Sequence, residues 1–116
     1  MTRTHAITHA RTHAGLGGWY SYRASKAALN QSLKCASIEL GRDARVSRGA
    51  KRSVACVALH PGTVDTPLSE PWQRNVKPEK LFTPQFSVEG MLAVCDGLEA
   101  KDNGRFLAYD GSEIPW

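Results

Sequence analysis

The chain has 116 residues, of which 41% are hydrophobic and 22% charged, and this size and composition predict one soluble globular domain with a modest core. No apolar run approaches the ~20 residues that a membrane-spanning helix needs, so we expect no membrane partner. The formal net charge of +4 is unevenly distributed. Residues 1–52 carry ten Lys/Arg and two acidic residues, a net of +8, whereas residues 53–116 carry five and nine, a net of −4.

The basic half of the chain raises the question of a nucleic-acid partner. Its positive charge is divided among an irregular N-terminus, a helix and one loop, with few aromatic residues between the charges to stack on bases. The densest cluster lies in the loop and consists of Arg45, Arg48, Lys51 and Arg52. We interpret this cluster as a solvated connection and expect no nucleic-acid partner.

Three cysteines, Cys35, Cys56 and Cys95, lie far apart in apolar surroundings. Their number is odd and their spacing is not that of metal ligands, so we expect reduced core residues. Reduced cysteines are typical of an intracellular protein, and we therefore expect a cytoplasmic location.

The N-terminus is unlike the rest of the chain, because Thr-His-Ala recurs at residues 4–6, 8–10 and 12–14 without an acidic residue or a large apolar face. Such a composition cannot bury a core, so we expect a disordered tail over residues 1–16, although it faintly resembles a transit peptide. In a helix, His5, His9 and His13 would share one side and could chelate zinc. No nearby carboxylate or cysteine completes a ligand set, so we expect no metal site.

The chemistry-bearing stretch is residues 20–26, YSYRASK. If Ser21 caps a helix that ends at Gly41, Tyr22 and Lys26 lie on one face, one turn apart, near the helix N-terminus. A phenol titrates near pH ~10 and needs a neighbouring ammonium and a helix N-terminus to act as a base at neutrality. Taken alone, this spacing also fits an ordinary helix, where tyrosines and lysines often fall four apart.

The same helix carries an apolar stripe that continues the row of the tyrosine and lysine. It consists of Leu29, Leu33, Ala36 and Leu40. A neighbouring face has only the small side chains of Ala24, Ala28 and Ser32, which permits close approach of a second helix.

Residues 53–59, SVACVAL, are apolar on both alternating faces, which predicts a central parallel strand covered on each side. The strand leads into His60-Pro61-Gly62, a turn at the end of the strand where open α/β sheets place ligands. His60 could be a catalytic base. A residue that ends a strand before a Pro-Gly turn is more often a packing or hydrogen-bonding residue, by about three to one.

Three prolines between Thr66 and Thr83 predict a mobile loop. Ser87 can cap a following helix that Asn103-Gly104 stops, and residues 105–109 read as a last strand. The buried face of that helix is expected to hold Val88, Met91, Leu92, Cys95 and Leu98. The strand–helix–strand order predicts two parallel strands, a thin sheet whose uncovered face would leave the fold marginal or dependent on a partner.

The flanks of the Tyr-x-x-x-Lys pair carry a family resemblance. Gly17-Gly18-Trp19 precedes the pair, Ala27-Ala28-Leu29-Asn30 follows it, and residues 60–66 read HPGTVDT. This pattern resembles the short-chain dehydrogenase/reductase (SDR) family, and its C-factor-like members most closely, from about Gly15 to Trp116. The resemblance implies an α/β fold over residues 17–116, the C-terminal part of a Rossmann-like doubly wound parallel sheet.

The resemblance also implies an NAD(P)-dependent oxidoreductase that acts on a small carbonyl compound or secondary alcohol. Tyr22 would be the acid/base, and Lys26 would lower its pKa and hold the nicotinamide ribose. After the Pro61-Gly62 turn, Val64 and Thr66 would fix the carboxamide. The segment after Thr66 folds over the substrate in the family, so Leu68, Trp72 and Val76 are candidates for substrate contacts, with plain hydrophobic anchoring as the equal alternative. Family members pair the helix that would span residues 21–41 across a subunit interface, which implies a homo-oligomer.

Two elements of the family pattern are missing. The family carries a serine ten to fourteen residues before the tyrosine, and here that window holds only Thr8 and Thr12 as hydroxyl residues. The glycine-rich phosphate turn and the residue that reads the adenosine ribose are also absent from these 116 residues, so NAD and NADP cannot be distinguished. A second hypothesis is therefore a truncated, non-catalytic chain that is inert or binds a full-length relative.

Overall fold

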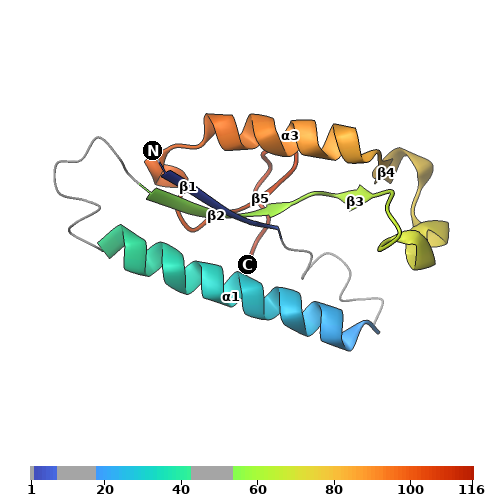
Figure 1. Cartoon of the computed structure of the whole chain (residues 1–116), viewed down its shortest axis with the longest axis horizontal. Helices are drawn as coiled ribbons and strands as arrows, with labels where there is room; N and C mark the ends of the chain where they lie inside the picture. The colour runs from blue at the N-terminus through green and yellow to red at the C-terminus, as the bar shows by residue number, and fades with distance from the viewer. Residues whose placement is uncertain (1, 8–17, 43–53) are drawn as a thin grey trace.

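The computed structural model describes residues 2–7, 18–42 and 54–116, and it shows an α/β fold (Figure 1). The last predicted strand and the two predicted helices are present. In chain order the helices and strands are β1 (Thr2–Ile7), α1 (Tyr20–Arg42), β2 (Val54–His60), β3 (Thr63–Val64), β4 (Leu81–Phe82), α3 (Pro84–Gly97) and β5 (Phe106–Ala108). Short 3-10 helices span Glu70–Asn75, Pro78–Lys80 and Ala100–Asp102.

The main sheet has the order β1-β2-β5, and all its pairings are parallel. Thr2 pairs with Val54 at one end of the β1–β2 ladder, and Ala58 pairs with Phe106 at the start of the β2–β5 ladder. The prediction of a two-stranded sheet is therefore wrong, because the sheet has three strands, and β2 is the central one. The strands β3 and β4 form a separate parallel pair.

The third strand comes from the segment expected to be a disordered tail. Residues 2–7 form β1, so the tail prediction fails there, although residues 8–16 lie outside the described residues. The physical reason is that an edge of β2 needs backbone N–H and C=O partners, which a chain of any composition can supply. The predictions for Thr8, Thr12, His9 and His13, and for the basic cluster at 45–52, also fall outside the described residues.

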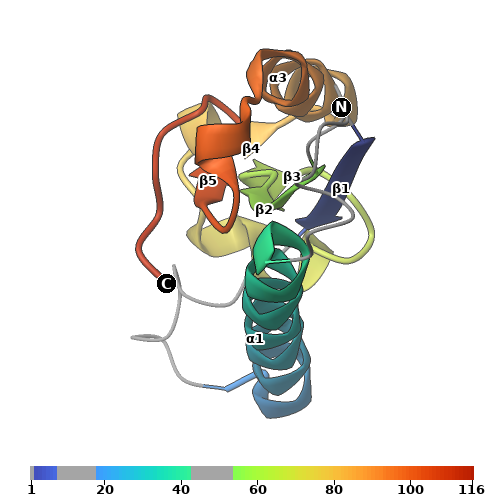
Figure 2. The ribbon, with the colours of Figure 1, turned by 90° about the vertical axis from the view of Figure 1, so that its left-hand side faces the viewer.

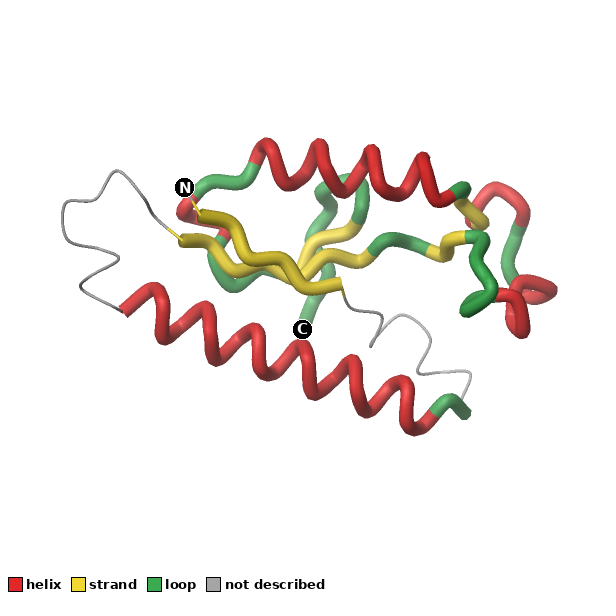
Figure 3. Tube along the Cα trace, viewed as in Figure 1, coloured by secondary structure: helices red, strands yellow, loops and turns green. Residues whose placement is uncertain are grey.

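Two helices cover opposite faces of the main sheet, with α1 on one side and α3 on the other (Figures 2 and 3). Cys56 and Ala58 of β2 pack in one core cluster with Leu33 of α1. Val57 and Leu59 point the other way, into a cluster with Leu98 and the half-buried Met91, Val94 and Cys95. The prediction that residues 53–59 form a strand buried on both faces is confirmed for β2, so the uncovered face that we expected for this strand is not found there.

The helix α1 begins at Tyr20, so Ser21 lies inside it and is not its cap. The chain enters the helix through Gly18 and Trp19, whose φ angles are 67° and 55°. Of the expected apolar stripe, Leu33 is buried, and Leu29, Ala36 and Leu40 are partly buried. Ser37, which is not part of that stripe, is also buried. The small-residue face of Ala24, Ala28 and Ser32 is exposed.

The helix α3 starts four residues earlier than expected, because Thr83 rather than Ser87 is its cap. The Thr83 hydroxyl accepts a hydrogen bond from the Phe86 N–H at 3.2 Å, and Pro84 occupies the first turn. The helix ends at Gly97 rather than at residues 103–104. Its buried face also differs, since Val88 and Leu92 are 48% and 58% exposed.

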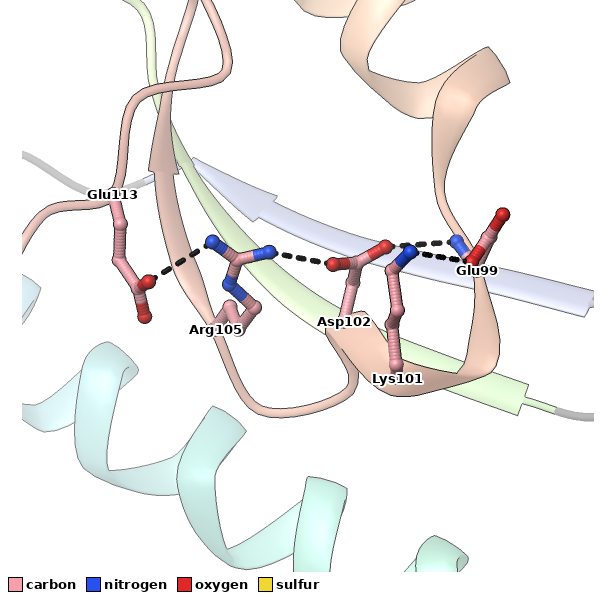
Figure 4. Close-up of polar contacts among 5 residues, drawn as sticks. All are labelled: Glu99, Lys101, Asp102, Arg105 and Glu113. Carbon is pink, nitrogen blue, oxygen red and sulfur yellow. Dashed lines mark hydrogen bonds and ion pairs between the residues drawn. The ribbon is translucent and has the colours of Figure 1, made fainter.

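A polar network closes the connection between α3 and β5 (Figure 4). The Glu99 backbone N–H donates to Asp102 at 2.9 Å, and Arg105 bridges Asp102 and Glu113 at 2.6 and 2.9 Å. The side chain of Asn103 accepts from the Cys56 N–H and donates to the Ser37 carbonyl, both at 2.9 Å. These bonds tie the connection to β2 and α1.

The three cysteines have different surroundings. Cys56 is buried, and burial raises the pKa of its thiol, whereas Cys95 is partly buried and Cys35 is exposed on α1. The expectation of three core cysteines is therefore wrong for Cys35, which lies outside the apolar stripe. Among the described segments, we find no helix that is both long and apolar enough to cross a membrane.

Candidate functional site

The predicted site residues gather where the carboxyl end of β2 meets the N-terminal ends of α1 and α3 (Figure 1). A cavity of about 690 Å³ lies there, a size typical of small-molecule sites. Its lining comes from α1, the turn after β2, the segment between β3 and β4, and the first turns of α3. The residues are Trp19, Tyr22, Arg23, Pro61, Thr63, Val64, Thr66, Leu68, Ser69, Pro71, Trp72, Asn75, Val76, Pro84, Ser87, Val88 and Met91.

Tyr22 lines the cavity from the first turn of α1. The Lys26 ammonium lies 5.7 Å from the centroid of the Tyr22 ring, so the two side chains share a face as the four-residue spacing predicts. Burial raises the pKa of the Tyr22 phenol above its ordinary value of 10.0. The family resemblance implied a lowered pKa. In this structure the loss of water around the phenol is the dominant effect.

The Pro61-Gly62 turn follows β2, and Pro61 lines the cavity. Two hydrogen bonds hold the turn in place. The Gly62 N–H donates to Nδ1 of His60 at 2.9 Å, and the buried Ser87 hydroxyl donates to the Pro61 carbonyl at 2.7 Å. His60 is therefore a buried hydrogen-bonding residue, as predicted. Gly62 has φ 77°, and a Cβ there would lie 2.6 Å from Cε2 of Phe82, so this position requires glycine.

The segment after β3 is organised by the buried side chain of Ser69. Its hydroxyl lies 2.5 Å from the Val64 carbonyl and accepts from the Thr66 N–H at 3.2 Å and from Nε2 of Gln73 at 2.9 Å. The expected mobile loop is thus built from two 3-10 helices, with the β3–β4 pair closing its ends. Leu68 and Trp72 lie on this segment and line the cavity.

The cavity brings together seven of the residues singled out from the sequence. They are Tyr22, Pro61, Val64, Thr66, Leu68, Trp72 and Val76. Lys26 and Gly62 are not on the lining but adjoin it, one beside Tyr22 and the other in the turn.

Sequence reasoning missed Trp19, Ser69 and Ser87 as parts of the site. Trp19 was visible only as a flanking residue of the Tyr-x-x-x-Lys pair. Ser87 was assigned to a helix cap, whereas its hydroxyl faces the Pro61 carbonyl. Nothing in the local pattern marks Ser69, because its partners become close only when the loop folds.

Comparisons with known proteins found sequence relatives and similar solved structures. No family model matches the chain. The C-signal of Myxococcus xanthus is 40% identical over 100 residues, which cover 86% of this chain and 51% of that protein. The 1-hydroxy-2-glutathionyl-2-methyl-3-butene dehydrogenase of a Rhodococcus species is 32% identical over 100 residues, which cover 86% of this chain and 39% of the enzyme.

Two solved structures share the fold. The NADPH-bound carbonyl reductase from chicken fatty liver superposes with a TM-score of 0.74 at 32% identity, over 98% of this chain and 42% of the reductase. The carbonyl reductase Sniffer of D. melanogaster gives 0.75 at 26% identity, over 98% and 41%. The chain is similar to part of a short-chain dehydrogenase/reductase. It spans about half the length of the C-signal of Myxococcus xanthus.

One structural neighbour holds NADPH, which implies a nicotinamide cofactor for the SDR family. The cavity suits the nicotinamide end of such a molecule, because it sets the hydroxyls of Tyr22 and Thr66 among apolar walls. The pyrophosphate end has no counterpart in the sequence, which lacks the glycine-rich turn. The residues present therefore fit the nicotinamide end of such a cofactor.

Proposed function

We propose that this chain carries the hydride-transfer site of an NAD(P)-dependent SDR oxidoreductase that interconverts a carbonyl compound and a secondary alcohol. One observation carries the proposal. Tyr22 of α1 and Pro61 of the turn after β2 line one cavity, although they are far apart in the sequence. Oxidoreductases among the relatives and the two carbonyl reductase structures support the class of reaction.

The proposed roles follow from position. Tyr22 is the acid/base, and Lys26 is its charged partner and holds the nicotinamide ribose. Pro61, Gly62, Val64 and Thr66 form the wall that would hold the nicotinamide. Leu68 and Trp72 contact the substrate from the segment between β3 and β4.

The chemistry of reduction suits the state of Tyr22. A reduced nicotinamide held beside Pro61, Val64 and Thr66 would supply the hydride for the carbonyl carbon, and the C=O π electrons would move to the oxygen. Because burial raises the pKa of Tyr22, its phenol is protonated at neutral pH and can donate that proton to the oxygen, which gives the alcohol. The partial positive charge at the N-terminus of α1, together with Lys26, stabilises the phenolate that remains.

The charge of the lining favours a neutral substrate. Among the described residues that line the cavity, Arg23 alone is charged, and its Nε donates to the Gly18 carbonyl at 2.9 Å. The other walls are largely apolar, with hydroxyl groups near the turn. A neutral ketone or aldehyde would leave no buried charge unpaired.

The first test is a titration of the full chain with NADPH and with NADH, followed by nicotinamide fluorescence. We expect saturable binding that Lys26→Ala weakens and Tyr22→Phe preserves. A Tyr20→Phe variant is the matched control, because Tyr20 is 85% exposed and does not line the cavity. Absence of saturable binding by either nucleotide to the folded chain would contradict the proposal.

The second test measures turnover of neutral ketones with the preferred nucleotide. Loss of a general acid lowers rates by roughly 10²- to 10⁴-fold, so Tyr22→Phe should reduce kcat by that factor and Tyr20→Phe should not. Equal turnover by the two variants would remove Tyr22 from the proposed role.

A further inference from the structure

Two tryptophans meet beside the cavity, and the proposed roles above use only one of them. The rings of Trp19 and Trp72 are 4.6 Å apart at 88°, an edge-to-face contact. Trp19 stands at the entry to α1, and Trp72 lies in the 3-10 helix Glu70–Asn75. Both line the cavity. The pair therefore joins the start of α1, which carries Tyr22, to the 3-10 helix Glu70–Asn75.

The backbone at Trp19 is held in an unusual conformation. Among the described residues it is the only non-glycine residue with a positive φ, at 55°. A bulky side chain in this region is strained, and such strain persists where the surrounding structure fixes it, often at functional sites. Here the Arg23 N–H donates to the Trp19 carbonyl at 2.9 Å, and the Arg23 Nε donates to Gly18. These bonds hold the backbone from which the Trp19 side chain projects.

Trp72 is fixed through Ser69. The Trp72 N–H donates to the Ser69 carbonyl at 3.0 Å, and the Ser69 hydroxyl is bound to the Val64 carbonyl and to Nε2 of Gln73. Both indoles therefore project from hydrogen-bonded backbone, and each ring contacts the other. The two rings border a cavity whose other walls include Leu68 and Val76.

We propose that Trp19 and Trp72 form an aromatic clasp that selects a flat aryl ketone or aldehyde over a saturated carbonyl compound of the same size. This inference rests on the proposed function, since it names the substrate class of the same site. Aromatic pairs attract through edge-to-face or offset contacts in addition to the burial of apolar area. A saturated ring buries similar area but lacks that attraction, so the clasp distinguishes the two by their π faces.

The test compares two ketones with the same number of heavy atoms, acetophenone and cyclohexyl methyl ketone, by equilibrium dialysis against the full chain without nucleotide. We expect acetophenone to bind about three- to tenfold more tightly. Trp19→Leu and Trp72→Leu should each bring this ratio close to one. Trp72→Phe keeps a ring and should keep the preference, which separates loss of the clasp from loss of the fold. Trp116→Phe is the control, because Trp116 does not line the cavity.

Several results would overturn the clasp. They are equal binding of the two ketones, absence of binding by either, and a preference that both leucine variants retain. The experiment is independent of hydride transfer and can be repeated in Tyr22→Phe. If the nucleotide titrations fail while the aryl preference holds, the proposed function is lost and the clasp stands. If the nucleotides bind and the preference is absent, the reverse is true.

Discussion

The two ends of β2 differ in their surroundings, because one is hydrogen-bonded to neighbouring elements and the other lies at the cavity. Near its amino end, Asn103 joins the Cys56 N–H to the Ser37 carbonyl, and Gly104 donates to the Cys56 carbonyl at 2.7 Å. At its carboxyl end, the turn at Pro61 opens onto a cavity of about 690 Å³ bordered by indoles and hydroxyls. The polar groups near the amino end of β2 hydrogen-bond to neighbouring elements and stabilise the fold. The polar groups at its carboxyl end surround the cavity.

The largest expected effect is at the carboxyl end, where Gly62→Ala places a methyl group against Phe82. The substitution combines a positive φ with overlap of the Phe82 ring, and we expect it to lower the free energy of unfolding by about 3 kcal/mol. Urea unfolding followed by circular dichroism measures this loss.

Gly18→Ala is the matched control for that substitution. Gly18 also has a positive φ of 67°, but a Cβ there would meet nothing within 4 Å, so only the conformational cost of about 1 kcal/mol is expected. Equal losses in the two variants would show that contact with Phe82 does not constrain the turn.

The next effect is at the amino end. Asn103→Ala removes the partners of the Cys56 N–H and the Ser37 carbonyl, and we expect a loss of about 2 kcal/mol in unfolding free energy. Since Asn103 lies outside the cavity lining, ketone and nucleotide affinities of the folded protein should not change. A parallel fall in affinity would erase the distinction between the two ends.

Unlike Asn103→Ala, Ser69→Ala should lower both the stability of the fold and the affinity for ketones. The hydroxyl holds Val64, Thr66 and Gln73 together, so its loss should cost about 1–2 kcal/mol of stability and weaken ketone binding as well. The same dialysis and urea measurements apply. Ser112→Ala, on an exposed turn, is the control and should leave ketone affinity unchanged.

The smallest effect depends on pH and belongs to the network of Figure 4. The Glu99 N–H and the Arg105 guanidinium lower the pKa of Asp102 in the folded state. Asp102 therefore contributes stability above its unfolded pKa of about 3.9, and this contribution is lost as pH falls through the lower folded value.

Asp102→Asn should accordingly be less stable than the parent chain by about 1 kcal/mol at pH 7, with a difference that shrinks below pH 4. Thermal unfolding at a series of pH values measures it. Glu79→Gln, at an exposed carboxylate, is the control. A constant difference across this pH range would exclude ionised Asp102 as the cause.

Much of the scaffold could be predicted from local patterns. The apolar run of residues 53–59 specified a buried strand, because side chains alternate faces and both faces were apolar. The helical spacing of Tyr22 and Lys26 predicted a shared face, which the 5.7 Å contact agrees with. Cap positions were less certain, since both Thr83 and Ser87 are good caps and only packing assigns Ser87 to Pro61.

The sequence by itself determined the helix with its tyrosine and lysine, the central strand and the Pro-Gly turn, because hydrophobic period and backbone preference act over a few residues. Only the tertiary structure decided that a polar N-terminal segment joins the sheet as β1, since backbone pairing there needs an available strand edge. It alone also decided that Trp19 meets Trp72 beside Tyr22, because that contact joins segments whose separation in the sequence carries no local signal.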